Sequence, residues 1–424
     1  KEIPAAFGLP LEFYFANSFY ARGDLALRND PFFYNTDSEY MGTNLVLKNE
    51  RIDLNLPLRA FASVGGSFWL FQLGRDRLSF GSANSGNLTI SDTPDYYDFA
   101  RLSLFSYNFK YTFFVTQLPL ETPSYFFKPG YDVRRTEGMQ DISQTTQRYL
   151  YLHRFDVRLW EKLSLGLSEG VLVGNSPLEL QYLNLFHIYH SLFSWREYPR
   201  WGQKEGDMTG SVFSLEVEWA WGGGFRFYGQ MVMNQFATPY ELQRWPEDNS
   251  PNGMGWLAGL EHNGDFQGWQ STLYVEGVYT DPYLYVLSSP FASFIWMRRL
   301  SELTSKPLRY SWIGHPEGRD TLLLLIGSML KKEPLQIHTV FSFTARGEHG
   351  LLWDWETGKT AVEQTTPSGT AEQHWQLSTQ IDWHVVPPIT LTFYVAGAYI
   401  QNFQHVQNKT NRGGEAGVTA RYRF

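Results

Sequence analysis

The segment Gly166-Leu167-Ser168-Glu169-Gly170 matches the nucleophile-elbow pattern, in which a serine attacks a carbonyl carbon. That chemistry needs the serine on a sharp turn between a strand and a helix, beside an oxyanion hole. Here the match follows Leu163 and Leu165 in an alternating apolar run that is typical of a strand interior. We therefore predict a structural role for Ser168 and no enzyme activity.

His187 and His190 are the next candidates, because two histidines three apart on a helix can share a metal ion. They lie in the segment Leu178 to Trp195, whose apolar residues recur at helical spacing, so we predict one short helix within a loop. We expect this helix to pack within the loop or to occlude part of the lumen. No further ligand is identifiable and the chain has no cysteine, so we predict neither a metal nor a cofactor.

Charged side chains recur at alternate positions of several predicted strands. Solvated ion pairs along a polar wall would explain them, and so would a selective pore or a surface that holds an anionic polymer. We predict that these residues line a lumen: Arg59, Lys110, Arg154, Arg158, Glu216, Glu218, Arg226, Glu276 and Asp382.

The elements that position these charges are strands with one apolar and one polar face. Between Phe213 and Trp219, apolar residues alternate with Ser214, Glu216 and Glu218. The stretch from Trp375 to Val385 shows the same period of two. A charge facing lipid at the bilayer midplane would cost about 2–4 kcal/mol, and the pattern avoids this cost. Glu169 is the exception, for which we expect a bulge or a position near the rim.

The composition of the 424 residues fits a membrane barrel: 17% are aromatic and 18% charged, while the longest apolar run, Leu322 to Ile326, is too short for a transmembrane helix. A net charge of −8 gives no basic footprint for nucleic acid. The start at Lys1 shows no signal peptide, from which we expect a processed, mature chain.

Short turns and long loops alternate along the chain, as in outer-membrane barrels. Counting from a first strand at Leu11 to Tyr20, and with turns such as Gly65-Gly66 and Asn263-Gly264, we expect about sixteen strands and both termini at the short-turn end. A hairpin of Tyr283 to Ser288 and Phe291 to Arg298 would bring the number to about eighteen. The prediction is an all-β fold: a single transmembrane antiparallel β-barrel domain, residues 1–424, in the lipid of the bacterial outer membrane. A soluble β-sandwich is the alternative.

Four stretches, in this order, resemble the Wzi-like capsule-assembly outer-membrane family. They are Gly74-Arg75-Asp76-Arg77 through Ser91; Gly166 to Gly170 with Leu180 to Phe186; Phe227 to Gln230 with Asn234 to Phe236; and Gly314-His315-Pro316-Glu317-Gly318-Arg319-Asp320. The resemblance implies a barrel of about eighteen strands that engages surface polysaccharide rather than catalysing a reaction. It also accounts for Gly166 to Gly170 without a nucleophile.

Two functions follow as hypotheses. The first is a non-enzymatic barrel that binds or organises surface polysaccharide, with Arg75, Arg77 and Arg101 as polar contacts and loop aromatics such as Tyr125, Trp201, Trp245 and Trp353 available for stacking on sugars. The second is a porin-like channel or transporter, which the charged residues at lumen positions would favour.

Overall fold

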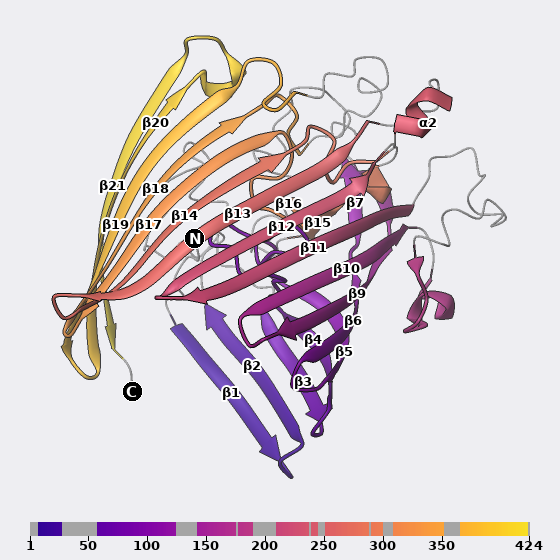
Figure 1. The fold of residues 1–424 in the computed structure, drawn as a ribbon, viewed down its shortest axis with the longest axis horizontal. Coiled ribbons are helices and arrows are strands. Elements are labelled where there is room, and N and C mark those ends of the chain that lie inside the picture. The colour runs from indigo at the N-terminus through magenta and orange to yellow at the C-terminus, as the bar shows by residue number, and fades with distance from the viewer. Residues whose placement is uncertain are drawn as a thin grey trace.

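A curved antiparallel sheet of seventeen strands forms the wall of the protein (Figure 1). The structure, a computed structural model, describes residues 7–27, 57–123, 142–174, 177–189, 209–236, 239–244, 251–287, 290–299, 308–351 and 365–422. Each wall strand pairs with the next wall strand along the chain, so the sheet is a continuous meander. The all-β barrel architecture predicted from the alternating pattern is confirmed.

The wall consists of long strands joined alternately by short turns and long connections. They are β1 (Phe7–Phe15), β2 (Phe19–Leu27), β3 (Arg59–Gly65), β4 (Trp69–Asp76), β5 (Tyr97–Phe105), β6 (Phe109–Gln117), β9 (Arg148–Leu159), β10 (Leu163–Gly174), β11 (Thr209–Gly222), β12 (Phe225–Gln235), β13 (Gly253–Phe266), β14 (Trp269–Thr280), β17 (Thr321–Lys332), β18 (Leu335–Arg346), β19 (Glu372–Val386), β20 (Ile389–Gln401) and β21 (Thr410–Tyr422).

Shorter elements lie in the long connections. Two further strand pairs are β7 (Leu120–Pro123) with β8 (Ile142–Thr146) and β15 (Ile295–Arg299) with β16 (Leu308–Trp312). The helical pieces are α2 (Pro239–Arg244) and the 3₁₀ turns Leu180–Leu183, Pro290–Ala292 and Phe403–His405. Among the described residues no helix has the length and apolarity needed to cross a bilayer.

The outward side chains of the wall are apolar and exposed, as a lipid-facing surface requires. On β20, Val395 is 56% exposed, whereas its neighbour Ala396 on the inner face is 5% exposed. Exposed aromatic residues gather near the short turns, including Trp219, Trp221 and Phe225, with the Trp221 and Phe225 rings stacked at 5.6 Å. An aromatic girdle of this kind marks one membrane interface.

The strand count places the two ends of the sheet differently from the prediction. Because seventeen strands alternate in direction, β1 and β21 run the same way: Phe7 lies at the long-loop end and Tyr422 at the short-turn end. The expectation that both termini lie at the short-turn end is therefore wrong for the described chain. Within residues 7–422 as described, no backbone pairing joins β1 to β21.

Three predicted boundaries also differ. Leu11 to Tyr20 is not one strand, because Ala16 and Asn17 take positive φ and turn β1 into β2. Asn263-Gly264 lies inside β13, and the turn falls instead at Gln267-Gly268, which both have positive φ. The expected hairpin of residues 283–298 adds nothing to the wall, because its second half, β15, pairs only with β16 in a separate sheet.

The predicted helix of Leu178 to Trp195 is replaced, in its described part, by the 3₁₀ turn Leu180–Leu183. This segment covers the outer face of β6, β9 and β10 and does not enter the lumen. The Tyr111 hydroxyl donates to the Leu185 carbonyl at 2.8 Å, and the His153 ring lies 4.5 Å from that of Tyr189.

Glu169 shares this covered face, and β10 stays in regular register through it, so the expected bulge is absent. The covering segment lies beside Glu169 and shields it from lipid. The segment exposes Leu180 at 81% and Phe186 at 92%, so the covered region still presents an apolar surface to the membrane.

A charge placed on the outer face should destabilise the barrel, whereas the same charge on the inner face should not. We predict that Val395→Arg lowers the free energy of unfolding by about 2–4 kcal/mol, because the guanidinium must enter hydrocarbon. Gln380→Arg is the matched control, since Gln380 faces inward and bonds Asp382. Urea titration of barrels folded in vesicles measures both, and equal losses would contradict the assignment of faces.

Candidate functional site

The inner face of the wall has two zones. Toward the long-loop end of β9–β13 it is apolar and buried, with Leu150, Leu152, Leu172, Val232 and Leu257 each at most 3% exposed. Toward the short turns it carries the charged residues predicted to line a lumen. Folded chain covers the long-loop half of β9–β14, so the inner face is not open to water there.

In the short-turn half, opposite charges pair across neighbouring strands. Arg154 donates to Glu216 at 3.0 Å and to Asp156 at 2.9 Å, and Arg226 donates to Glu261 at 2.8 Å. Glu218 lies 3.5 Å from Arg226. These pairs form a polar wall whose positive and negative groups neutralise one another.

The remaining predicted lumen residues share this inner face. Lys110 is directly opposite Asp156 in the β6–β9 register, and Asp382 accepts from Gln380 and Thr392. Arg158 is exposed near the β9–β10 turn. Arg59 belongs to the inner face as well, but at the long-loop end of β3.

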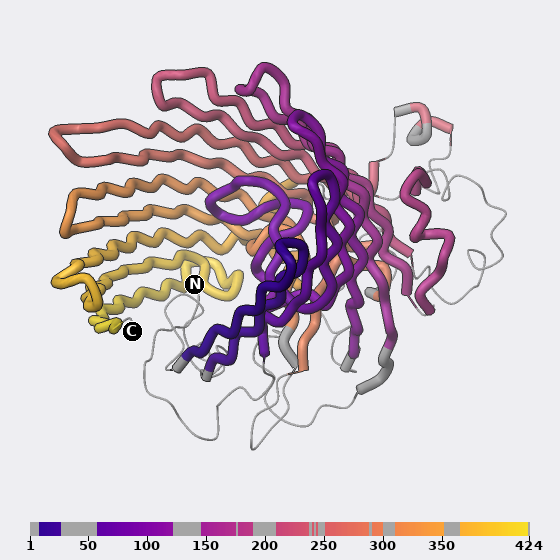
Figure 2. Tube along the Cα trace, turned by 90° about the horizontal axis from the view of Figure 1, so that it is seen from below, coloured from indigo at the N-terminus to yellow at the C-terminus, as the bar shows by residue number. Residues whose placement is uncertain are grey.

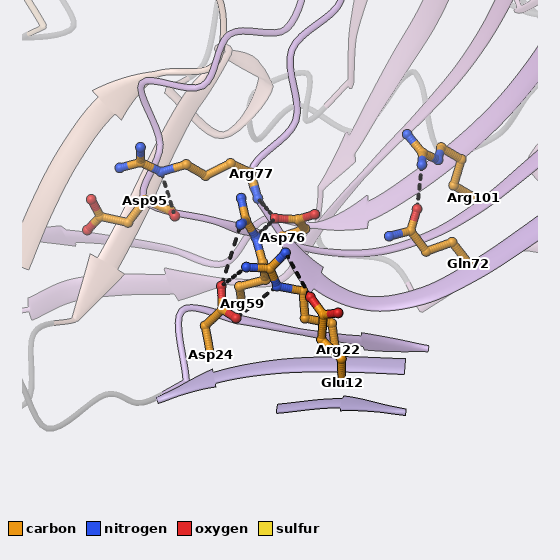
Figure 3. A network of polar contacts seen from close by, with 9 residues as sticks. All are labelled: Glu12, Arg22, Asp24, Arg59, Gln72, Asp76, Arg77, Asp95 and Arg101. Atoms are coloured by element: carbon orange, nitrogen blue, oxygen red, sulfur yellow. Dashed lines mark hydrogen bonds and ion pairs between the residues drawn. The ribbon is translucent and has the colours of Figure 1, made fainter. Parts of the chain in front are cut away.

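A polar network runs along β1–β5 toward the long loops (Figure 3). Arg22 bonds Asp24 at 2.8 Å, and Arg59 bonds Asp76 at 2.6 Å and reaches Asp24 at 3.5 Å. Arg22 and Asp24 were not predicted, because a single strand at Leu11 to Tyr20 left their strand, β2, unassigned.

The three arginines predicted to contact polysaccharide are not brought together. Arg75 faces outward, where it forms two bonds of 2.7 and 2.9 Å with Asp98 and lies 3.8 Å from the Tyr96 ring centroid. Arg77 lies at the long-loop end, and its side chain donates to the Asp95 carbonyl at 3.4 Å. Arg101 faces inward and bonds Gln72 (Figure 3).

Two stretches of chain fill the apolar half of the interior. We call residues 77–96, between β4 and β5, the first inner segment, and the described residues of 281–320, between β14 and β17, the second inner segment. Leu88 and Ile90 of the first, and Leu284 and Ile313 of the second, are at most 1% exposed. All four belong to one apolar cluster with inward residues of the wall. Figures 1 and 2 show the sheet curving around this interior.

The two inner segments bond to each other and to the wall. Tyr285 donates its hydroxyl hydrogen to the Leu88 carbonyl at 2.5 Å, and the Ser91 amide donates to the Ile313 carbonyl at 2.9 Å. On the wall, Arg148 is fully buried and donates to the Ser293 carbonyl at 2.8 Å. These bonds satisfy backbone groups that would otherwise be buried unpaired, so they fix the segments in place.

Glu276 is the central contact between the first inner segment and the wall. Its carboxylate accepts from the backbone amides of Asn84 at 2.8 Å and Ser85 at 3.0 Å, and from the hydroxyls of Tyr228 at 2.7 Å and of Ser85. The side chain is fully buried. Because every partner is a donor, the site fits an acceptor-only carboxylate, which makes these hydrogen bonds strong.

Ser85 also contacts His315, so serine, histidine and glutamate lie together, yet the order of the bonds does not suit nucleophilic catalysis. The Glu317 amide donates to His315 Nδ1 at 3.3 Å, which leaves Nε2 with the hydrogen that faces Ser85 Oγ at 3.0 Å. A histidine that donates to the serine cannot take its proton. Burial lowers the pKa of His315 to about 4, so the ring is neutral at physiological pH.

Ser168 of the nucleophile-elbow match lies in the middle of β10, paired regularly with Arg154 of β9 and Ser214 of β11. It therefore lacks the strand-turn-helix geometry of that motif. His187 is described and His190 lies outside the described residues. Among the described residues there is no cluster of ligands that could hold a metal ion.

The glycines of two family-like stretches allow the inner segments to approach closely. Gly86 has a φ of +127°, and a Cβ there would lie 2.3 Å from Pro316 Cδ. A Cβ on Gly314 would lie 2.3 Å from the Tyr285 hydroxyl. Any larger residue at these positions would push the segments apart.

The sequence contained a signal for this filled interior that the strand analysis did not use. Residues 149–152, 171–173 and 322–326 are apolar or aromatic at consecutive positions, which indicates strands with apolar surroundings on both faces. The loop aromatics Tyr125, Trp201, Trp245 and Trp353 lie outside the described residues.

Comparisons with known proteins support the fold class. No family model and no curated protein matches the chain. Among solved structures, the chain is similar to Wzi of Escherichia coli, described as an outer-membrane protein involved in group 1 capsule assembly and a carbohydrate-binding β-barrel. The TM-score is 0.57 at 14% identity, over 98% of this chain and 78% of that one.

The chain also matches OccD3 (OpdP) of Pseudomonas aeruginosa, at 11% identity and a TM-score of 0.45, over 98% of this chain and 86% of that one. At these identities the likeness concerns the fold. The fold is that of a bacterial outer-membrane β-barrel, a class whose outward face is in contact with membrane lipid.

Loss of the Glu276 carboxylate should loosen the first inner segment. Hydrogen bonds to a charged group contribute about 1.5–3 kcal/mol, so Glu276→Gln should speed amide exchange at Asn84 and Ser85 roughly ten- to hundredfold. Glu261→Gln is the control, because Glu261 pairs with Arg226 on the same face. Hydrogen-exchange mass spectrometry of the peptide around Ser85 checks this, and unchanged protection would exclude Glu276 as the anchor.

Acid should also weaken the docking of the inner segments. The docked His315 has a pKa of about 4 and the released side chain about 6.5, so the released state binds more protons as the pH falls between these values. The free energy of docking is at its full value above pH 6.5 and falls by up to roughly 3 kcal/mol by pH 4. Planar-bilayer conductance should therefore rise between pH 6.5 and 4. In His315→Gln, which keeps a donor but does not titrate, this rise should be absent.

Proposed function

We propose that this barrel binds or organises surface polysaccharide at its long-loop end, without catalysing a reaction. The observation that supports this function is the filled interior, because buried apolar segments bonded to the wall occupy the long-loop half of the barrel and confine its polar lining to β1–β5, unlike the open polar lumen of a porin. A barrel of this kind serves as a rigid support for a binding surface rather than as a conduit. The structural likeness to Wzi, a carbohydrate-binding barrel, agrees with the proposal.

The three predicted arginine contacts have different parts in this proposal. Arg77 is placed best to meet a polymer, since it lies at the start of the first inner segment beside Asp95. Arg75 is bonded to Asp98 on the outer face, so it would meet a polymer that runs over the rim. Arg101 lies deeper, beside Gln72, and would be reached only by a chain that enters the barrel.

A channel is the second candidate, and the charged short-turn half favours it. Paired charges such as Arg154–Glu216 and Arg226–Glu261 make a polar vestibule that a small solute could enter. Passage through the barrel would then need the inner segments to move.

Binding of an acidic oligosaccharide separates the arginine roles. We expect Arg77→Gln to weaken binding of a uronic-acid oligosaccharide by about tenfold, since a charge-assisted hydrogen bond contributes roughly 1.5 kcal/mol. Arg158→Gln, at the short-turn end, should bind like the unaltered barrel. Calorimetry with the oligosaccharide and its carboxyl-reduced form measures this, and identical affinities for both sugars would contradict a role for the arginines.

Conductance separates the two functions. With the inner segments docked, we expect the unaltered barrel at pH 7.5 to give no stable ionic current in a planar bilayer. Deletion of residues 78–94, which leaves β4 and β5 intact, should produce an open channel. A steady current through the unaltered protein at this pH would favour the channel over polysaccharide binding.

A further inference from the structure

A shallow hollow of about 620 Å³ lies on the wall at β18–β21. Its apolar lining includes Phe341, Leu377 and Tyr399, with Gly397 and Gly414 at its floor and Arg412 at one side. Its volume is within the range of about 300–1,000 Å³ that is usual for small-molecule pockets.

The hollow faces the membrane and not the lumen. Leu377 and Tyr399 point outward and are 54% and 43% exposed, whereas the inward neighbours Ala396 and Ile400 are at most 5% exposed. Strand register places Trp375, Tyr399 and Arg412 side by side in one outward row, because each is the direct partner of the next.

Two glycines on the outward face create the hollow. Leu377 pairs with Gly397, which pairs with Gly414, so two adjacent outward positions carry no side chain. A Cβ built on Gly397 meets nothing within 4 Å, and one on Gly414 meets only the Ala396 carbonyl oxygen at 3.6 Å. The backbone would therefore accept larger residues at both positions, so steric crowding does not require glycine there.

The row above the glycines lies at the outer membrane interface. Arg412 is two residues from Thr410, where β21 begins at the long-loop end, and long loops face the outside of the cell. The Trp375 and Tyr399 rings lie beside it, 5.6 Å apart and tilted against each other, in the position of aromatic girdle residues. The Arg412 guanidinium is exposed and bonds no group among the described residues.

We propose that this hollow binds one acyl chain of an outer-leaflet glycolipid, whose headgroup phosphate is held by Arg412. The apolar floor excludes water and accepts a hydrocarbon chain. The guanidinium at headgroup level offers paired donors in the geometry that phosphate oxygens accept. The complementarity of a cation directly above an apolar hollow selects an anionic lipid over a zwitterionic one.

The test compares lipid retention by variants that fill the hollow or remove the charge. The delipidated full-length barrel in detergent is titrated with bis-phosphorylated lipid A or with phosphatidylcholine, and adducts are counted by native mass spectrometry. We expect a one-to-one lipid A adduct with the unaltered barrel, and at least a tenfold loss of it in Gly414→Leu and in Arg412→Gln. Phosphatidylcholine should bind weakly to all of them.

Two controls match these variants on the same strand. Gly417→Leu places leucine on the inner face, also in open space, and Arg421→Gln removes a cation at the short-turn end. Both should retain lipid A. Equal adducts in all variants would overturn the proposal, and so would a dimer mass abolished by Gly414→Leu, since the hollow would then belong to a second copy of the chain.

Discussion

Backbone hydrogen bonding in hydrocarbon is the constraint on which this structure depends. A strand in a bilayer must pair its amides and carbonyls with neighbouring strands, because lipid offers no partner. Among the described residues, every wall strand between β1 and β21 pairs on both sides, while β1 and β21 each pair with one neighbour. This pairing forces side chains to alternate between lipid and interior. The outward apolar row and the inward ion pairs such as Arg154–Glu216 both follow from that alternation.

The alternation is also the part of the fold that could be predicted from the sequence, because it depends only on neighbours along one strand. The outward Trp219 and the inward Asp382 were assigned to the correct faces in this way. Turns were harder, since Asn263-Gly264 has turn chemistry yet continues β13. There the ladder with β14 outweighs the local preference, because Asn263 pairs with Thr272 and Gly264 with Ser271.

The contents of the barrel could not be predicted from alternation, because it does not say what covers the inner face. Glu276 is inward by parity, but its partners Asn84 and Ser85 are almost two hundred residues away in the chain. The same holds on the outer face, where the segment of Leu180–Leu183 covers Glu169 and His153. For the proposed binding site, Arg75 and Arg101 were predicted together, whereas strand register places them on opposite faces of the wall, beside Asp98 and Gln72.

The central claim is that one parity of the wall faces lipid, and spin labelling along β20 tests it most directly. The chain has no cysteine, so single cysteines from Thr390 to Ala396 can each carry a nitroxide in the folded barrel in vesicles. We predict that the labels at 391, 393 and 395 collide freely with oxygen dissolved in lipid, while those at 390, 392, 394 and 396 do not. Equal shielding at all seven positions, as between two stacked sheets, would contradict it.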